Sequence, residues 1–186
     1  RDLHLSLRRQ RQMCIRDRGK PLLTHVYEAA MKIEHREIYI VYGFGGEEVQ
    51  NTLKDSQISW VEQEEQLGTG HAVQQVLPNI PKSDDILVLY GDVPLISETS
   101  LIKLVEAAAD TGFSLLTAYF DEPYGYGRII RDSNDDIIAI IEEKDATEEQ
   151  QKICEVNAGF LVVRAEILNC LLYTSDAADE GLGVDL

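Results

Sequence analysis

Two short apolar runs, each closed by a glycine, constrain the fold of this chain more than any other feature. The runs are EIYIVY at Glu37–Tyr42 and DILVLY at Asp85–Tyr90. Near-continuous apolar segments of this length are typical of parallel strands whose two faces are both covered by helices. Segments with helical apolar spacing alternate with such strands along the chain. The pattern therefore predicts an α/β protein with a largely parallel sheet.

The same periodicities assign the remaining elements. Helices are predicted at Pro21–Ile33, Glu47–Leu53, Gly70–Val76, Ser97–Ala109 and Thr147–Ile153. Ser97 is the expected N-cap of the fourth helix, with Ser100 as a weaker alternative. Further strands are predicted at Ile58–Val61, Phe113–Phe120 and Gly159–Val163, and a hairpin joins Gly127–Arg131 to Ile137–Ile141.

Charge and cysteine usage exclude several classes of protein. The net charge of −16 argues against a nucleic-acid partner, because such surfaces cluster Lys and Arg. A small phosphorylated ligand stays compatible, since backbone N–H groups and a bound cation can hold phosphates. No apolar run is long enough for a membrane span, and the N-terminus lacks the apolar stretch of a secretory signal. Cys14, Cys154 and Cys170 fit neither a disulfide framework nor a zinc site, so we expect a cytoplasmic protein.

Both ends of the chain differ in composition from its middle. Residues 1–18 contain six of the 17 basic residues, and residues 173–186 are small and acidic. The strings QRQMCIRDR and CLLYTSDAADE resemble translated sequencing-adapter DNA. We therefore expect residues 1–18 and 172–186 to be non-native segments that flank a core at residues 19–171. The alternative is a basic arm and an acidic tail.

A glycine-containing loop precedes the third predicted helix. In the string QLGTGHA, Gly68 and Gly70 would let backbone N–H groups approach a ligand at the start of a helix. The loop lacks the third glycine of a dinucleotide-binding fingerprint, which argues against a dehydrogenase. An ordinary tight turn explains the same spacing, and it is the preferred interpretation of the glycines at residues 43–46.

Asp92 directly follows the apolar strand Asp85–Tyr90, in the string YGDVP. Ligands of open α/β sheets bind at the carboxyl ends of the strands. A carboxylate at that edge suits a Mg²⁺ ion that bridges phosphates. An Asx turn that leaves the strand is an equally good interpretation of this residue alone. The strings GYGR, EEKD and NAG, taken singly, likewise do not differ from structural turns.

Taken in order, the strings QLGTGHA, LYGDVPLI, GYGRI, EEKDAT and NAG resemble one family. It is the N-terminal uridyltransferase domain of bacterial bifunctional UDP-N-acetylglucosamine pyrophosphorylase/glucosamine-1-phosphate N-acetyltransferases. The similarity runs from about Gly19 to Leu171. It implies a Rossmann-like nucleotide-diphospho-sugar transferase fold and a cytoplasmic enzyme that makes precursors of peptidoglycan and lipopolysaccharide. The implied reaction joins UTP to N-acetylglucosamine 1-phosphate, with Mg²⁺, to give UDP-N-acetylglucosamine and pyrophosphate.

The resemblance also implies roles for individual residues. Gln63 matches the residue that reads the uracil edge, and Gly68 and Thr69 match the nucleotide-binding backbone and hydroxyl. Asp92 matches the Mg²⁺ ligand and is the expected catalytic residue. The residues that would line the sugar nucleotide are Tyr90, Gly91, the backbone of Gly127, and the side chains of Glu142 and Asn157, with Lys144 as a phosphate contact.

The sequence departs from the family at its start. The family begins with an apolar strand, a loop of the type LAAGxGTRM and a Pro-Lys, and residues 1–18 contain none of these. We therefore expect the first strand and the phosphate loop to be missing, with an exposed sheet edge and impaired turnover. The acetyltransferase β-helix that builds the family trimer is also not in the sequence, so a trimer is expected only with it. The alternatives are a non-catalytic UDP-sugar-binding fragment and a pyrophosphorylase for another sugar 1-phosphate.

Overall fold

The computed structural model describes most of the chain. The residues that it does not describe are 1–2, 9–15, 18, 44–45, 47–49, 52, 54–56, 66 and 173–186. The chain forms two compact units, which are called the large and the small unit below. The large unit comprises Arg1–Ser114 and Val162–Leu186, and the small unit comprises Leu115–Leu161.

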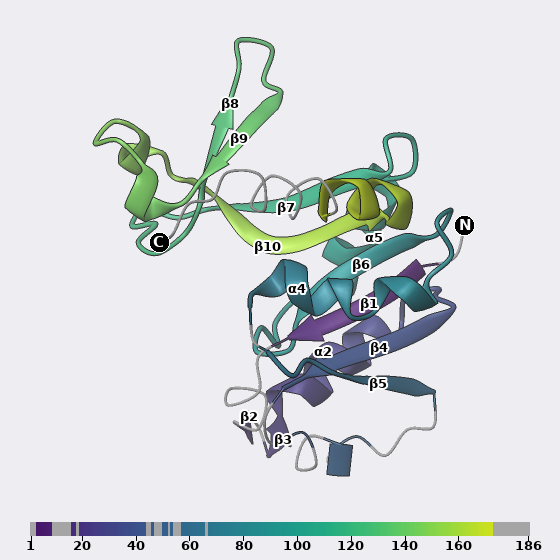
Figure 1. Cartoon of the computed structure of the whole chain (residues 1–186). Coiled ribbons are helices and arrows are strands. Elements are labelled where there is room, and N and C mark those ends of the chain that lie inside the picture. Colours follow the sequence, from purple (N-terminus) through teal and green to yellow (C-terminus); the bar gives the residue numbers. More distant parts are fainter. Residues whose placement is uncertain are drawn as a thin grey trace. The chain divides into compact units, whose positions relative to one another are not determined.

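A parallel sheet forms the centre of the large unit (Figure 1). Its strands lie in the order β5-β4-β1-β6, and each neighbouring pair is parallel. The strand bounds are Leu3–Arg8 for β1, Glu37–Tyr42 for β4, Ile58–Glu62 for β5 and Asp85–Tyr90 for β6. The sheet confirms the predicted α/β class and places four carboxyl ends at one edge.

Strand β1 corrects the expectation that the first strand is missing. Residues Leu3–Arg8 lie between β4 and β6, with Leu5 opposite Ile38 on one side and opposite Leu87 on the other. The alternation of leucine with polar residues in LHLSLR is a strand signal that the arginine-rich composition obscured. The central position is therefore filled and the sheet has no open edge there. The prediction that residues 1–18 are non-native concerns their origin and stays a prediction.

The two apolar strands predicted from sequence form the core of this sheet. Ile40 in β4 and Leu87 and Leu89 in β6 are completely buried. Burial of a Leu or Ile side chain stabilises a fold by roughly 1.5–3 kcal/mol, so these strands hold the sheet together. Their continuous apolar sequence follows from their burial on both faces.

Helices cover both faces of the large unit's sheet, with α4 in front of it and α2 behind it in Figure 1. The helices are α2 (Leu22–Ala30), α4 (Thr69–Gln74) and α5 (Glu98–Ala107), a 3₁₀ turn η1 (Leu77–Asn79) and a helical segment at residues 165–172. Ser97 caps α5 as predicted, because its Oγ accepts a hydrogen bond from the backbone N–H of Ser100 at 3.1 Å. A separate two-stranded ribbon pairs β2 (Arg16–Asp17) with β3 (Lys20–Pro21).

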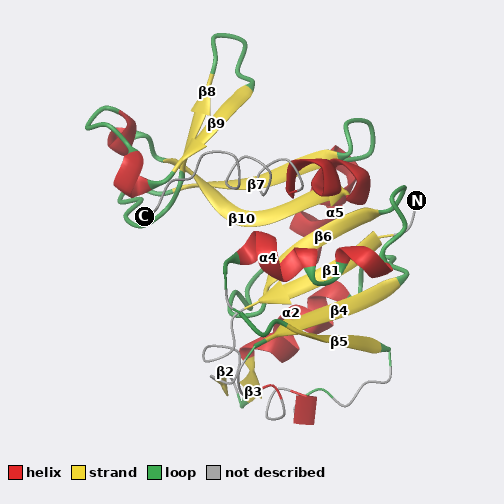
Figure 2. Cartoon of the chain, viewed as in Figure 1, coloured by secondary structure: helices red, strands yellow, loops and turns green. Residues whose placement is uncertain are grey.

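The small unit is built on antiparallel strands. The predicted hairpin is confirmed as β8 (Arg128–Arg131) and β9 (Ile137–Ile141), which Figure 2 shows as paired arrows. Strand β8 also pairs with β10 (Glu155–Arg164), and β7 (Phe113–Tyr119) pairs with β10 as well. Strands β7 and β10 each have residues in both units.

One predicted helix of the small unit is wrong. The segment Thr147–Ile153 contains only the 3₁₀ turn η3 (Gln150–Lys152). Thr147 and Gln150 exchange two hydrogen bonds, one from Thr147 N to Gln150 Oε1 at 2.8 Å and one from Gln150 N to Thr147 Oγ1 at 3.3 Å. This capping box starts a helical turn, but the exposed residues that follow supply no apolar face to prolong it.

Two further expectations concern a predicted helix and membrane spans. Most of the predicted helix Glu47–Leu53 lies outside the described residues. Within the described part of the chain, no helix combines the length and the apolar character that a bilayer span requires.

Candidate functional site

Six of the predicted site residues lie in the large unit, and most of them follow the carboxyl ends of its parallel strands. Gln63 comes directly after β5, Tyr90 is the last residue of β6, and Gly91 and Asp92 form the turn that follows it. The N–H of Val93 closes this turn on the carbonyl of Tyr90 at 3.3 Å. This edge is where open α/β sheets bind their ligands.

Gln63 and Asp92 lie at this edge but on strands that are not neighbours. Strands β4 and β1 separate β5 from β6. Three interstrand spacings amount to roughly 14 Å. The two side chains would therefore contact different parts of a bound molecule and not the same group.

The side chain of Gln63 is held by the glycine loop. It is only 3% exposed, and its Nε2 lies 3.3 Å from the carbonyl oxygen of Gly68 and 2.9 Å from Nδ1 of His71. The backbone N–H of Gln63 donates to the carbonyl of Tyr42 at 2.6 Å, which extends the pairing of β5 with β4 by one residue. The structure thus brings the predicted residues Gln63 and Gly68 together.

Gly68 has a conformation that requires glycine. Its φ of 119° lies in the region that side chains with a Cβ rarely adopt. Gly68 is the residue before α4, and Thr69 is the first residue of the helix. The glycine was predicted for close approach to a ligand, and the structure adds a second reason, because Gly68 turns the chain into α4 and presents its carbonyl to Gln63.

Asp92 is the residue predicted to bind Mg²⁺ together with substrate. Among the described residues, no group of three or more His, Cys, Asp or Glu side chains could form a metal site from protein alone. Mg²⁺ usually binds through one or two carboxylates together with waters and substrate phosphates. A single carboxylate after the end of β6 is compatible with that mode.

Three predicted residues of the small unit converge on one point. The N–H of Asn157 donates to the carbonyl of Gly127 at 2.8 Å. A Cβ on Gly127 would lie 3.0 Å from Cγ2 of Ile140, which is tight, and 3.4 Å from Oε1 of Glu142, so the Glu142 carboxylate lies beside this glycine. Asn157 Oδ1 accepts from the N–H of Gly159 at 2.8 Å. This fixes the amide and leaves its NH₂ group directed away from that bond.

The fourth predicted residue of the small unit is not part of this cluster. Lys144 lies in the 3₁₀ turn η2 (Glu143–Asp145), and its side chain is exposed. Its neighbour Glu143 instead accepts a hydrogen bond from the N–H of Gly125. The turn therefore anchors the loop before β8.

The sequence reasoning assigned no role to two residues near these clusters. His71 was quoted within QLGTGHA without a role, although it contacts Gln63. Arg128 is 2% exposed, and its guanidinium donates to the carbonyls of Tyr126 and Gln151. His71 could have been considered because it lies in the same string as Gly68, whereas the contact of Arg128 with a residue 23 positions later had no sequence signal.

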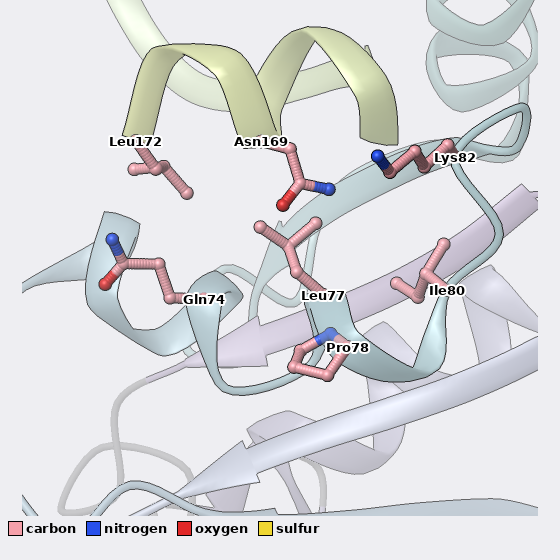
Figure 3. A pocket seen from close by; sticks show the side chains of 7 residues that line it. All are labelled: Gln74, Leu77, Pro78, Ile80, Lys82, Asn169 and Leu172. Atoms are coloured by element: carbon pink, nitrogen blue, oxygen red, sulfur yellow. The ribbon is translucent and has the colours of Figure 1, made fainter. Parts of the chain in front are cut away.

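A separate pocket of about 380 Å³ lies elsewhere in the large unit (Figure 3). It is bounded by the segment that joins α4 to η1 and by the helical residues 165–172, and its walls include Leu77, Ile80, Lys82, Asn169 and Leu172. None of the predicted site residues lines it.

Comparison with known proteins decides the family. Residues 9–168 match the MobA-like NTP transferase domain. The chain belongs to this family. This NTP transferase domain is 51% identical to "Bifunctional protein GlmU" of Azoarcus sp. (strain BH72). The similarity extends over 144 residues, or 77% of this chain. The matched part of the chain spans 32% of the length of that relative.

Solved structures of low sequence identity share the fold of this NTP transferase domain. A UDP-glucose pyrophosphorylase complexed with UDP-glucose has a TM-score of 0.73 at 15% identity, covering 91% of this chain and 78% of its own. A CMP:2-keto-3-deoxy-manno-octonic acid synthetase complexed with CTP has a TM-score of 0.72 at 12% identity, covering 97% and 84%. The predicted nucleotide-diphospho-sugar transferase fold is thereby confirmed.

Proposed function

We propose that this NTP transferase domain is a uridyltransferase core that recognises UTP and N-acetylglucosamine 1-phosphate and forms UDP-N-acetylglucosamine and pyrophosphate. The observation that carries the proposal is the convergence of Gly127, Glu142 and Asn157, which sequence resemblance had assigned to the sugar. The 51% identity to a protein named GlmU supports the same reaction.

The residues divide the recognition between them. Gln63, Gly68 and Thr69 would bind the uridine, and Tyr90 and Gly91 would line the sugar-nucleotide site. The carboxylate of Glu142 and the free amide hydrogens of Asn157 suit the hydroxyl and acetamido groups of N-acetylglucosamine. In this arrangement the protein positions the reactants and forms no covalent intermediate.

The reaction is an attack by the sugar-phosphate oxygen on the α-phosphorus of UTP, with pyrophosphate as the leaving group. Asp92 would hold Mg²⁺, which when bound neutralises charge on the phosphates. Lys144, in the turn η2, is a weaker candidate for a phosphate contact. Residues 1–18 contain no glycine-rich phosphate loop, so we expect turnover to be slow even where both substrates bind. We retain the proposals that residues 1–18 and 172–186 are non-native and that the protein acts in the cytoplasm.

Separate titrations of the full chain with UDP and with N-acetylglucosamine 1-phosphate test the proposal. Gln63→Leu is expected to abolish UDP binding and to leave sugar-phosphate binding intact. The reason is that Gln63 lies in the large unit, whereas the residues proposed to bind the sugar lie in the small unit. Asn157→Leu is expected to give the reverse pattern. Loss of both ligands in both variants, with unchanged thermal unfolding, would contradict the division of roles.

The runner-up is a pyrophosphorylase for another sugar 1-phosphate. Glucose 1-phosphate serves as the comparison ligand, since it lacks the acetamido group that Asn157 would contact. Equal affinity for glucose 1-phosphate and N-acetylglucosamine 1-phosphate would favour that alternative.

A further inference from the structure

The imidazole of His71 contacts a side-chain amide on each of its two nitrogens. Its Nδ1 lies 2.9 Å from Nε2 of Gln63, and its Nε2 lies 3.0 Å from Nε2 of Gln75. An amide nitrogen donates hydrogen bonds and cannot accept them, whereas a neutral imidazole has one accepting nitrogen and one that carries a proton. Only one of the two amides can therefore donate to His71 in this arrangement.

Burial decides which amide keeps its orientation. Gln63 is 3% exposed, and its Nε2 also donates to the carbonyl of Gly68 at 3.3 Å. Turning this amide over would place its oxygen against that carbonyl oxygen and leave buried polar groups unsatisfied, which is costly. Gln75 Nε2 likewise donates to a carbonyl, that of His71, at 3.3 Å, but Gln75 is only partly buried. Water can therefore satisfy the groups that separate when Gln75 turns its oxygen toward the ring. Nδ1 of His71 therefore accepts from Gln63, and Nε2 of His71 carries the proton.

This assignment uses both amide hydrogens of Gln63. One is donated to Gly68 and the other to His71, so the oxygen Oε1 is the atom that remains for a ligand. We propose that His71 is a positioning residue that fixes the Gln63 amide with its oxygen available, so that the site selects a base edge that donates a hydrogen bond. The inference rests on the proposed role of Gln63 in uridine recognition.

The chemistry of the base follows from this orientation. The N3–H of uracil is a donor that an amide oxygen can accept, whereas the corresponding N3 of cytosine is an acceptor. Without His71, only the long contact with Gly68 would restrain the amide of Gln63. The amide would then also present its NH₂ group, which opposes the N3–H of uracil and weakens the preference.

Titration of the full chain with UDP and with N3-methyl-UDP tests the proposal, because the methyl group removes only the N3–H donor. In the unaltered chain UDP is expected to bind more tightly than N3-methyl-UDP. In His71→Ala we expect the affinity ratio of the two ligands to fall by about tenfold, the effect of losing one hydrogen bond that holds a buried amide. Any steric effect of the methyl group is the same in both proteins and cancels in this ratio.

Two further variants separate positioning from a loss of structure. His71→Asn places an accepting oxygen where Nδ1 stood, so the ratio is expected to stay within about twofold of the unaltered chain. Gln75→Ala removes the other amide and is expected to leave the ratio unchanged. A fall in Gln75→Ala equal to that in His71→Ala would overturn the proposal.

The outcomes also distinguish this inference from the proposed function. If the unaltered chain binds no UDP, the proposed function fails and the inference fails with it. If it binds UDP and His71→Ala leaves the ratio unchanged, only the inference fails. A ¹⁵N NMR spectrum of the imidazole gives a readout without ligand, and the proposal requires the proton on Nε2. A proton on Nδ1 would overturn it.

Discussion

Glu155 and Arg131 form the strongest ion pair of the small unit, and its contribution to stability can be measured. Arg131 donates from Nε to Oε2 and from Nη2 to Oε1 of Glu155, each at 2.8 Å. The pair ties β8 to β10 in a bidentate geometry, which is the favourable one for arginine and a carboxylate. The Glu155 side chain is 7% exposed and that of Arg131 is 31% exposed.

The pair makes stability depend on pH. The hydrogen bonds from Arg131 lower the pKa of Glu155 from 4.5 to about 2, against burial, which raises it, and with help from Thr117. Because the folded pKa lies below the unfolded one, the stabilisation is complete above about pH 4.5 and is lost as the pH falls toward 2. Each pH unit between the two pKa values corresponds to about 1.4 kcal/mol, which gives at most about 3.5 kcal/mol. Since solvent reaches Arg131, we expect about 2 kcal/mol.

Glu155→Gln removes the charge and keeps the shape of the side chain. At pH 7 the variant is expected to lose about 2 kcal/mol of unfolding free energy, and near pH 2.5 most of this difference should disappear. Urea unfolding followed by circular dichroism at several pH values measures it. Asp135→Asn is the control, because its carboxylate lies 3.8 Å from Arg131 but is 88% exposed, and we expect no measurable change. A difference of the same size at pH 7 and at pH 2.5 would refute the electrostatic reasoning.

Three further predictions follow from single contacts. Ser97→Ala should lower the unfolding free energy by about 1 kcal/mol, because α5 loses the side chain that caps the N–H of Ser100. Thermal or urea unfolding measures this loss, and an unchanged midpoint would contradict the prediction. Gly127→Ala should weaken binding of N-acetylglucosamine 1-phosphate and spare UDP, because the new Cβ would lie 3.0 Å from Cγ2 of Ile140 and that side chain must shift beside the Glu142 carboxylate. Titration calorimetry would show whether the loss is confined to the sugar. Asp92→Asn should abolish the Mg²⁺ dependence of UDP binding, measured with and without EDTA, whereas an unaltered dependence would place the ion elsewhere.

The strands of the large unit could be predicted because burial on both faces leaves a direct record in sequence. Glu37–Tyr42 and Asp85–Tyr90 were predicted with the bounds that the structure shows. Strand β1 was missed because six arginines in residues 1–18 suggested a foreign segment, although Leu3, Leu5 and Leu7 alternate as in a strand. Composition outweighed periodicity there, and the periodicity was the better guide to structure.

For the candidate site, the sequence predicted individual residues but not the contacts between them. The resemblance named Gly127, Glu142 and Asn157 individually, and the structure places them near one another, through a hydrogen bond from the N–H of Asn157 to the carbonyl of Gly127 and the approach of Glu142 to Gly127. The pair of Arg131 and Glu155 had no sequence signal, because the two residues are 24 positions apart and only the strand register joins them. Side-chain orientation, such as that of the Gln63 amide, depends on partners that a linear pattern does not specify.

Calorimetric titration of the full chain with UDP-N-acetylglucosamine, with UDP-glucose as the control, tests the central claim most directly. Both ligands carry the same uridine diphosphate and differ in the acetamido group that Asn157 would recognise. The account predicts saturable binding of UDP-N-acetylglucosamine that is tighter than binding of UDP-glucose and is lost in Gln63→Leu. No binding of UDP-N-acetylglucosamine by a chain that unfolds cooperatively would contradict it.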